Sequence, residues 1–460
     1  MAENNFSLQK TLTMLLDEKK YHSLRDILST MNPADIAAIF DELDQARLPL
    51  LFRLLPKELA AETFVEMEPE AQELLIRGFS DSELKEVIDE LYVDDAVDIV
   101  EEMPANVVKK VLRHTEAGRR ELINKFLKFP EDCAGSIMTI EFVEFHPNIT
   151  VGDALTKIRK TGINKETVYY CYVISADRRL MGLVELKSLL IEDDSKTVGD
   201  IMETNPIYVN TLDDQEHVAN VFRKYGFYSM PVVDQEQRLV GIITADDVMT
   251  VMEEEATEDI EVMAAVSPSE KPYLKTGVFT LAKHRIIWLL VLMLSATFTA
   301  NIISGFEQLL SSMIVLSSFI PLLMDTGGNA GSQSSTLVIR GMALDEIHPS
   351  DILRVIWKEV RVALIAGTSL SVFNFLRIML LNFLSHYMSF EAVDPMVAVV
   401  VSISMLFTVV IAKVIGCILP IVAKKLKFDP AIMAAPLITT IVDSLALLVY
   451  FATASLLLHI

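Results

Sequence analysis

The chain has 460 residues, a formal net charge of -23 and a mean hydropathy of +0.38. Acidic chains are normally hydrophilic, so two dissimilar parts must be joined here, and so acidic a surface argues against nucleic acid as a partner. Ten basic and ten acidic residues follow His284, which places the whole excess charge in the first 284 residues. Three widely separated cysteines predict no disulfide framework and fit a reducing cytoplasm.

Residues 1–132 are predicted to form a small superhelical stack of short amphipathic helices. The segment NPADIAAIFDEL, which starts at Asn32, recurs in degenerate form from Leu55, from Ser80 and from Val93. No single unit of such a repeat can bury its apolar face alone, so neighbouring units are expected to stack.

Two copies of an α/β module are predicted next, in residues 133–200 and 201–257. In the first copy a helical pattern leads to the strand-like VYYCYVIS and then to RRLMGLVE. In the second copy the corresponding pattern leads to SMPVVD and then to QRLVGIIT. This alternation of β-branched runs with helical periodicity is typical of a tandem α/β pair.

Acidic residues share helical faces in both cytoplasmic regions. Asp94 and Asp98 are four residues apart, as are Glu58 and Glu62, and like charges so placed repel unless a cation neutralises them. The segment 246–261, DDVMTVMEEEATEDIE, predicts a dense acidic helix, followed by a connecting segment in 258–284. A solvated surface is the ordinary interpretation, and a sensor for divalent cations is the functional one.

Residues 285–460 contain five apolar stretches, which predict an all-α transmembrane domain. Basic residues precede the first stretch and lie between the second and third and between the fourth and fifth, whereas the other two connections have none. This alternation places the N-terminal part in the cytoplasm and the C-terminus outside. Lys413 and Arg377 are expected to snorkel or to pair with a neighbouring acid. The stretches are near Ile286–Ser304, Leu309–Leu337, Val362–Leu384, Met396–Val422 and Ala431–Leu458.

The second stretch contains an unusual polar segment, PLLMDTGGNAGSQSST, which starts at Pro321. Pro321 can open the helical hydrogen-bond ladder, and the glycines allow close backbone approach. Asp325, Asn329 and their neighbours offer hard oxygen ligands, which suit Mg²⁺ or Ca²⁺ rather than zinc or copper. Simple helix packing would explain the glycines but not so many oxygen atoms.

Asp443 is the only charged residue after Pro430, with His459 taken as neutral. It is expected about 20 Å along the last helix, near mid-membrane, where an isolated carboxylate costs several kcal/mol. Ala435 and Thr439 share its helical face. The alternatives are a cation site and a buried hydrogen bond or pair between helices. A two-fold axis through the lumen would present two Asp443 carboxylates to a Mg²⁺ ion that keeps most of its water.

Together these features resemble the MgtE family of Mg²⁺ channels over nearly the whole chain, and the tandem module resembles a pair of CBS domains. The resemblance implies a homodimer whose pore is lined by the second and fifth spans. It implies Asp443 as the central Mg²⁺ ligand, with Asn329, Ala435, Thr439 and Asp325 nearby. It also implies that cytoplasmic Mg²⁺ bridges acidic faces and holds the channel shut, at positions that match Glu62, Asp94, Asp98, Asp214, Glu216, Asp247, Glu255, Glu258 and Asp259.

Some members of this family bind ATP in the CBS pair. Tyr170 and Phe227 are candidates for stacking on a base, but Lys187 and Ser188 stand where an Arg-Asp pair can contact the nucleotide. ATP is therefore an open expectation, whereas Mg²⁺ is the expected ligand of the membrane and cytoplasmic sites.

The expected function is Mg²⁺ uptake and homeostasis in a bacterial cell membrane, by a multi-pass protein that is not an enzyme. Low internal Mg²⁺ leaves the acidic faces unneutralised, so the domains separate and the pore opens. Two alternatives remain. One is a cation exchanger coupled to a counter-ion, and the other is a Mg²⁺ sensor that is merely anchored in the membrane.

Overall fold

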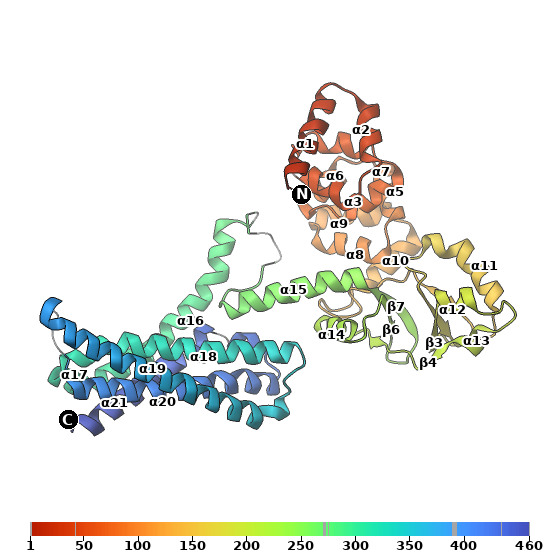
Figure 1. The fold of residues 1–460 in the computed structure, drawn as a ribbon. Helices are drawn as coiled ribbons and strands as arrows, with labels where there is room; N and C mark the ends of the chain where they lie inside the picture. Colours follow the sequence, from red (N-terminus) through yellow and green to blue (C-terminus); the bar gives the residue numbers. More distant parts are fainter. Residues whose placement is uncertain are drawn as a thin grey trace. The chain divides into compact units, whose positions relative to one another are not determined.

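The computed structural model describes residues 2–41, 43–269, 273–274, 276–388, 393–433 and 435–459. The chain divides into two compact units, Met1–Met252 and Glu253–Ile460. Figure 1 shows the helices and strands of both units in sequence colours. The first unit combines stacked helices with two small sheets, and the described residues of the second unit form helices joined by loops, without a strand.

The first unit begins with short helices that stack as the repeat predicts. Helix α3 packs on α5, α5 on α7 and α7 on α9. Their apolar faces form one continuous core, in which Ile36, Phe64 and Leu84 are fully buried. The helices are α1 (Ala2–Asp17), α2 (Tyr21–Leu28), α3 (Pro33–Asp41), α4 (Leu48–Phe52), α5 (Lys57–Val65), α6 (Pro69–Gly78), α7 (Asp81–Glu90), α8 (Val93–Glu102), α9 (Ala105–His114) and α10 (Ala117–Phe126).

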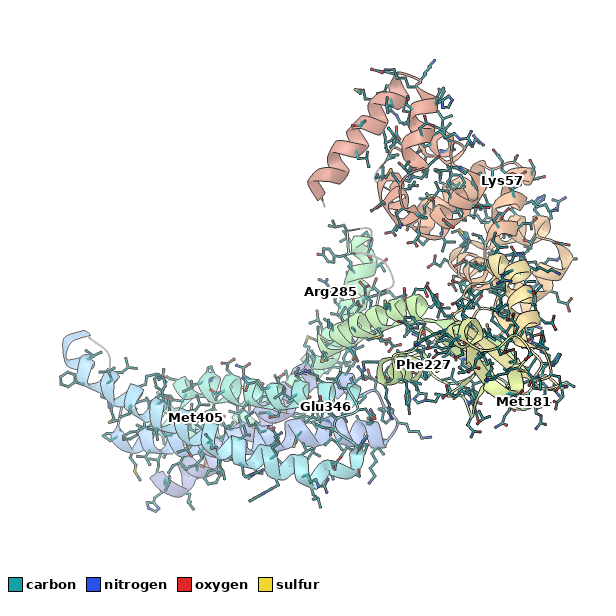
Figure 2. The ribbon with its side chains drawn as sticks, turned by 45° about the vertical axis from the view of Figure 1, so that its right-hand side comes forward. Lys57, Met181, Phe227, Arg285, Glu346 and Met405 are labelled. Carbon is teal, nitrogen blue, oxygen red and sulfur yellow. The ribbon has the colours of Figure 1, made fainter. Side chains whose placement is uncertain are left out.

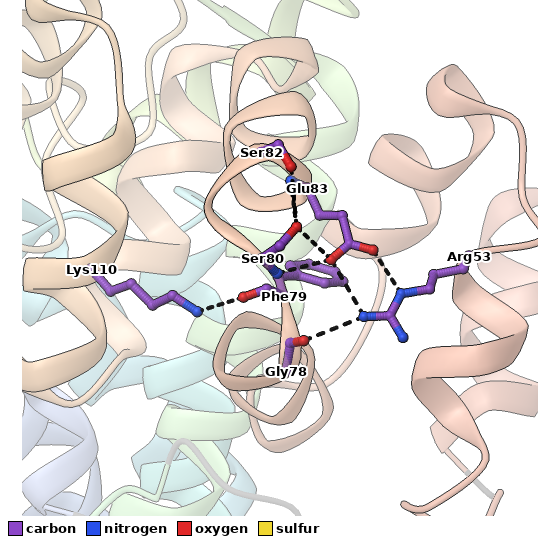
Figure 3. Close-up of polar contacts among 7 residues, drawn as sticks. All are labelled: Arg53, Gly78, Phe79, Ser80, Ser82, Glu83 and Lys110. Carbon is purple, nitrogen blue, oxygen red and sulfur yellow. Dashed lines mark hydrogen bonds and ion pairs between the residues drawn. The ribbon is translucent and has the colours of Figure 1, made fainter.

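Polar contacts at the start of α7 fix successive helices to one another (Figure 3). The Ser80 hydroxyl accepts a bond from the Glu83 backbone N–H, and the Glu83 carboxylate accepts one from the Ser80 N–H, which is a capping box. Arg53 pairs with Glu83 at 2.7 Å, and Lys110 donates to the Phe79 carbonyl at 2.8 Å. Hydrogen bonds from Arg53 and Ser80 lower the pKa of Glu83 to about 2. The carboxylate of Glu83 therefore stabilises the helical stack and is not a candidate cation ligand.

Each α/β module has its own sheet with the same core pairing. In the first sheet β1 runs parallel to β2, which pairs antiparallel with β3 and then β4, and in the second β5 runs parallel to β6, which pairs antiparallel with β7. The strands are β1 (Val143–Phe145), β2 (Tyr170–Ile174), β3 (Leu180–Glu185), β4 (Glu203–Thr204), β5 (Val209–Asn210), β6 (Ser229–Val233) and β7 (Leu239–Thr244). The helices are α11 (Val151–Thr161), α12 (Leu186–Ile191), α13 (Val198–Ile201) and α14 (Gln215–Tyr225), with the 3₁₀ turn η1 (Gly162–Asn164).

The two modules join symmetrically along β3 and β7. The Leu180 N–H donates to the Gln237 carbonyl at 3.1 Å, and the Leu239 N–H donates to the Arg178 carbonyl at 2.9 Å. The buried Tyr172 hydroxyl lies 2.9 Å from the hydroxyl of a serine on β6. These reciprocal bonds make the tandem pair a single body, which the sequence repeat alone does not specify.

The acidic segment after the second module is helical, as predicted. Helix α15 covers Ala245–Met263, and Glu254, Glu258 and Glu261 lie along it at spacings of three to four residues. Of the expected connecting segment 258–284, α15 contains the residues up to Met263 and α16 those from Val278. Residues 270–272 and 275 of that segment lie outside the described residues.

In the described part of the second unit, four helical stretches are long and apolar enough to cross a membrane by length and composition. They are Val278–Gly305, Pro349–Leu384, Pro395–Lys425 and Pro430–Leu458. The corresponding elements are α16 (Val278–Gly305), η3 (Pro349–Asp351) with α19 (Ile352–Met388), α20 (Pro395–Lys425), and η4 (Pro430–Met433) with α21 (Ala435–Leu458).

The second predicted span differs from a simple apolar helix. It consists of α17 (Glu307–Ser312), the 3₁₀ segment η2 (Ile314–Phe319) and α18 (Ile320–Ala343). Pro321 was expected to open the hydrogen-bond ladder of a helix. It instead lies in the first turn of α18, where its missing N–H breaks no helical hydrogen bond. At 24 residues α18 is long enough to span a bilayer, and its polar segment lowers its hydropathy.

Helix α18 lies against both α20 and α21, while α19 packs on α20 and α16 packs on α21. The glycines of α18 face this interior. A Cβ added at Gly331 would lie 2.9 Å from the Ile438 side chain, and one added at Gly416 of α20 would overlap the Gly331 carbonyl oxygen. Backbone contact between α18 and α20 therefore depends on glycine at both positions, as close packing in membranes requires.

Candidate cation sites

The first candidate site lies where α18 crosses α21. A Cβ added at Gly328 would lie 3.0 Å from the Thr439 methyl carbon and 3.8 Å from Oδ1 of Asp443. One added at Gly327 would lie 3.0 Å from the Val442 side chain. The predicted glycine contacts are thus real, and they bring the Asp443 carboxylate directly against the backbone of α18.

A polar stripe runs along α18 beside this crossing. Asp325, Asn329 and Gln333 are four residues apart and are all exposed in the single chain. Thr439 and Asp443 of α21 are half-buried. Asp325 is the acidic group that acts electrostatically on Asp443, so the structure brings these two predicted site residues together.

The first turn of α21 is closed by hydrogen bonds to the carbonyl of Pro436. This proline is the second residue of the helix, and its carbonyl accepts bonds from the hydroxyls of Thr439 at 2.9 Å and of Thr440 at 3.1 Å. The carbonyl is therefore occupied by side chains. Ala435 is the first residue of α21, and its side chain lies outside the described part of the chain.

Two contacts that the sequence did not reveal position the ends of α18. The buried Tyr450 hydroxyl donates to the Leu316 carbonyl in η2 at 2.9 Å. This bond gives a hydrogen-bond partner to a carbonyl outside the α-helices, where backbone groups at membrane depth must be satisfied by protein or water. Toward the other end, the Ser335 hydroxyl donates to the Met433 carbonyl in η4 at 3.0 Å. A tyrosine in an apolar run and a serine in a small-residue run carry no sequence signal for such roles.

A second candidate site lies in the first unit, where α8 meets the α/β pair. We call it the acidic cluster and define it as Asp94, Asp95 and Asp98 of α8 together with Glu141, Glu166 and Asp247. Asp95, Asp247, Glu141 and Glu166 all act electrostatically on Asp94. Asp246 and Asp247 both act on Glu166. Asp94, Asp98 and Asp247 were expected from the sequence, and the fold adds Asp95, Glu141 and Glu166.

Burial and mutual repulsion raise the pKa values of five carboxyl groups in the acidic cluster, those of Asp94, Asp95, Asp98, Glu166 and Asp247. Desolvation is the largest cause, and it raises the pKa of Asp95 to about 6 and that of Glu166 to about 8. The Asp98 side chain is exposed to solvent, yet the protein atoms around its carboxyl group and the charge of Asp95 raise its pKa to about 7. The pKa of the buried Asp94 rises well above its ordinary value for the same reasons. A nearby cation would stabilise the ionised form of these carboxyl groups, so the cluster is expected to bind positive charge.

Little positive charge is built into this cluster. Arg119 acts on Asp95, but its guanidinium donates to the backbone carbonyls of Asp89 and Leu91. One carboxylate oxygen of Asp94, Oδ1, is buried without a hydrogen-bond partner. Among the described residues, no group of three His, Cys, Asp or Glu side chains is arranged to hold a bare metal ion.

Other predicted regulatory residues lie elsewhere. Asp214 caps the N-terminus of α14 by accepting a bond from the Glu216 N–H at 2.9 Å, and both side chains are exposed. Glu62 is exposed on α5. Glu255 and Asp259 are half-buried on α15, and Glu258 of the same helix is exposed.

A surface pocket of about 410 Å³ lies in the α/β pair beside β2 and α12. Tyr169, Tyr170 and Tyr228 line it, with ring centroids of Tyr169 and Tyr228 5.8 Å apart, and Lys187 contributes a positive charge. Tyr170, a predicted base-stacking residue, is therefore in this pocket. Phe227, labelled in Figure 2, instead stacks on Tyr225 with centroids 5.5 Å apart.

Comparisons with known protein families match most of the chain. Residues 320–453 match a family described as divalent cation transporter, and residues 31–132 match the MgtE intracellular N domain. Residues 134–194 and 198–254 each match a CBS domain.

Individual relatives match over nearly their full length. The magnesium transporter MgtE of Thermus thermophilus is 35% identical, over 98% of this chain and 99% of that protein. The protein of the same name in Bacillus subtilis is 31% identical, over 97% of each chain.

Two solved structures resemble the N-terminal half. The cytosolic domain of the Mg²⁺ channel MgtE in complex with ATP is 34% identical, with a TM-score of 0.51, over 53% of this chain and 99% of that one. The soluble part of a magnesium transporter is 29% identical, with a TM-score of 0.52, over 56% and 100%.

Proposed function

Because the chain belongs to the MgtE family, we propose that it carries Mg²⁺ across a membrane along a path lined by α18 and α21. The chain is a multi-pass membrane protein. Its relatives are named as transporters, and the same role for this chain, rather than an enzymatic one, is part of the proposal.

One observation carries the proposal, namely the polar stripe of α18 beside Asp443. Asp325, Asn329 and Gln333 are exposed in a single chain, yet they lie on a helix that packs among membrane-spanning helices. Charged and amide groups facing lipid would cost several kcal/mol, so such groups normally face a protein interior or a water-filled path. A hydrated path supplies the water that these side chains need.

A second copy of the chain would complete this path. A two-fold axis beside the stripe would face each polar surface with its equivalent, which covers it from lipid without a different partner. Two Asp443 carboxylates, with Asp325, Asn329, Thr439 and the backbone of Ala435 nearby, would then hold Mg²⁺ largely through its bound water. Mg²⁺ dehydrates reluctantly and commonly binds proteins in this way.

The acidic cluster is the proposed cytoplasmic sensor. At low Mg²⁺ its carboxylates repel one another, which weakens the contact of α8 with the α/β pair. Mg²⁺ restores that contact by supplying positive charge, and the closed state follows. Further proposed members of the sensor are Glu255, Glu258 and Asp259 on α15, together with Glu62, Asp214 and Glu216.

The proposed location is a bacterial cell membrane, with the N-terminal units in the cytoplasm and the C-terminus outside. The alternation of basic residues between the spans supports this orientation. In that orientation a negative interior drives uptake by roughly 4.6 kcal/mol per divalent ion at 100 mV. No further energy source is needed for inward flow.

A counter-ion-coupled exchanger is the second candidate. The electrostatic contact of Asp325 with Asp443 supports it, because paired carboxylates can exchange a proton or a monovalent cation for Mg²⁺. Flux that requires an opposing gradient of H⁺ or Na⁺ would favour the exchanger, and unitary currents would favour the channel.

Nucleotide binding by the α/β pair is a further part of the proposal. The aromatic pocket at Tyr170 has a size and lining suited to a stacked base, and Lys187 can meet a phosphate. A related cytosolic domain was solved in complex with ATP. Titration of the purified chain with ATP, compared with its Tyr170→Ala variant, tests this assignment.

The decisive experiment measures Mg²⁺ uptake by vesicles that contain the full chain. Asp443→Ala is expected to abolish uptake and to leave a folded dimer, since a half-buried alanine adds no strain to α21. Glu346→Ala is the matched control, because that carboxylate is exposed in the connection after α18 (Figure 2). Parental uptake by folded Asp443→Ala would remove Asp443 from the path.

A further inference from the structure

Lys413 is the basic side chain that the membrane unit buries most deeply. It lies within α20 and is 6% exposed, and no other lysine or arginine among the described residues is buried. Long basic side chains in a membrane normally extend to the aqueous interface. Lys413 instead remains inside, so its charge must be balanced there.

Two residues on two other helices balance and bind this ammonium group. Lys413 Nζ donates to the Ser334 hydroxyl of α18 at 3.1 Å and lies 3.9 Å from Glu359 Oε2 of α19. The Ser334 hydroxyl in turn donates to Glu359 Oε2 at 2.6 Å. Ser334 is fully buried, and the Glu359 side chain is only 13% exposed. The three side chains form a neutral, closed set that links α18, α19 and α20.

This set adjoins the close glycine contact between α18 and α20. Ser334 follows Gly331 by one helical turn, and Lys413 precedes Gly416 by the same interval. A Cβ added at Gly331 would lie 3.2 Å from the Ala412 carbonyl oxygen. Glycine contacts allow α18 and α20 to approach but do not specify register along the helices, whereas a directional bond to a buried charge does.

The polar stripe depends on the register of α18. Ser334 lies on the buried face of the helix and directly follows Gln333 on the exposed face. A turn or shift of α18 at Ser334 therefore also moves Asn329 and Asp325, because an α-helix transmits rotation along its length.

We propose that Lys413 is a positioning residue for permeation: bound by Ser334 and Glu359, it holds α18 in the rotation that presents Asp325 and Asn329 beside Asp443. This inference rests on the proposed function of the α18–α21 path. In this role Lys413 affects transport although it does not contact the transported ion.

The test uses Mg²⁺ uptake by the full chain in vesicles of phosphatidylethanolamine and phosphatidylglycerol. Ser334→Ala removes the bridging hydroxyl and keeps both charges, and it is expected to fold with at least a fivefold loss of flux. Ser369→Ala is the matched control, because that exposed hydroxyl of α19 bonds only within its own helix. Lys413→Arg keeps the charge and the donors, and it is expected to retain flux within twofold.

A double variant separates positioning from folding. Lys413→Met alone leaves Glu359 buried and unpaired, so its failure to fold would be uninformative. Lys413→Met with Glu359→Gln leaves no unpaired charge and is expected to melt within a few degrees of the parent. Its flux is still expected to be at least fivefold lower, with a changed ratio of Mg²⁺ to Co²⁺ permeation. Parental flux and selectivity in either this folded double variant or folded Ser334→Ala would overturn the proposal.

Asp443→Ala distinguishes failure of the proposed ion path from failure of the proposed role of Lys413. If Asp443→Ala transports normally, the path itself is wrongly assigned. If Asp443→Ala is inactive while the folded double variant transports normally, only the positioning role of Lys413 fails.

Discussion

Neutralising Asp95 is expected to strengthen the contact between α8 and the α/β pair in the absence of Mg²⁺. Asp95→Asn keeps the size of the side chain and removes one negative charge from the acidic cluster. The residue was not identified from the sequence, so the effect depends entirely on the neighbours that the fold supplies.

The magnitude follows from the pKa of Asp95, which burial and the charge of Asp247 raise from 3.8 to about 6. At about 1.4 kcal/mol for each pKa unit, the ionised side chain destabilises the folded state by about 3 kcal/mol at neutral pH. Partial exposure of the carboxylate and screening by salt reduce this value. A gain of about 1–2 kcal/mol is therefore expected for Asp95→Asn, which corresponds to roughly 5- to 30-fold less opening of α8.

Hydrogen–deuterium exchange of the α8 amides in the full chain measures this opening directly. In Mg²⁺-free buffer at pH 7.5, Asp95→Asn should slow exchange by that factor. Added Mg²⁺ should slow exchange in the parent and should have a smaller effect in the variant, because part of the repulsion is already gone. Asp35→Asn is the control, since Asp35 is exposed in the first turn of α3. Unchanged or faster α8 exchange in Asp95→Asn would refute the electrostatic account of the cluster.

Two further predictions test the same physical reasoning elsewhere. The folded-state pKa values of Asp98, about 7, and Glu166, about 8, lie above their ordinary values; the folded state therefore retains protons that the unfolded state loses. Without Mg²⁺, α8 protection corrected for intrinsic exchange should fall as pH rises from 5.5 to 8, and a rise would contradict this sign. Gly416→Ala should destabilise the membrane unit by about 1–3 kcal/mol, because its Cβ overlaps the Gly331 carbonyl oxygen. Thermal unfolding in detergent checks this, with Gly305→Ala as control since its Cβ meets no atom within 4 Å, and equal melting temperatures would show that α18 and α20 adjust freely.

The sequence was sufficient for the helical stack and the tandem α/β modules, because units that cannot bury an apolar face alone must stack. The contact of α18 with α21 was expected only from the resemblance to the MgtE family. Closely spaced glycines permit a close helix contact but do not specify the partner helix. The second span was less predictable. Its polar segment lowers the hydropathy of α18 below that of the other spans, and the Leu316 carbonyl in the 3₁₀ segment η2 is bound by the distant Tyr450 hydroxyl.

By itself, the sequence determined which candidate cation ligands the chain contains: a lone carboxylate at Asp443, hard oxygen groups around Asn329, and acids four apart on α8. Only the tertiary structure decided which of them share one electrostatic environment. Glu141 and Glu166 join the cluster, and Ser334 and Glu359 join Lys413, although long stretches of chain separate them. The physical reason is that the energy of a charge depends on all neighbours within a few ångströms, and chain folding rather than local sequence brings those neighbours together.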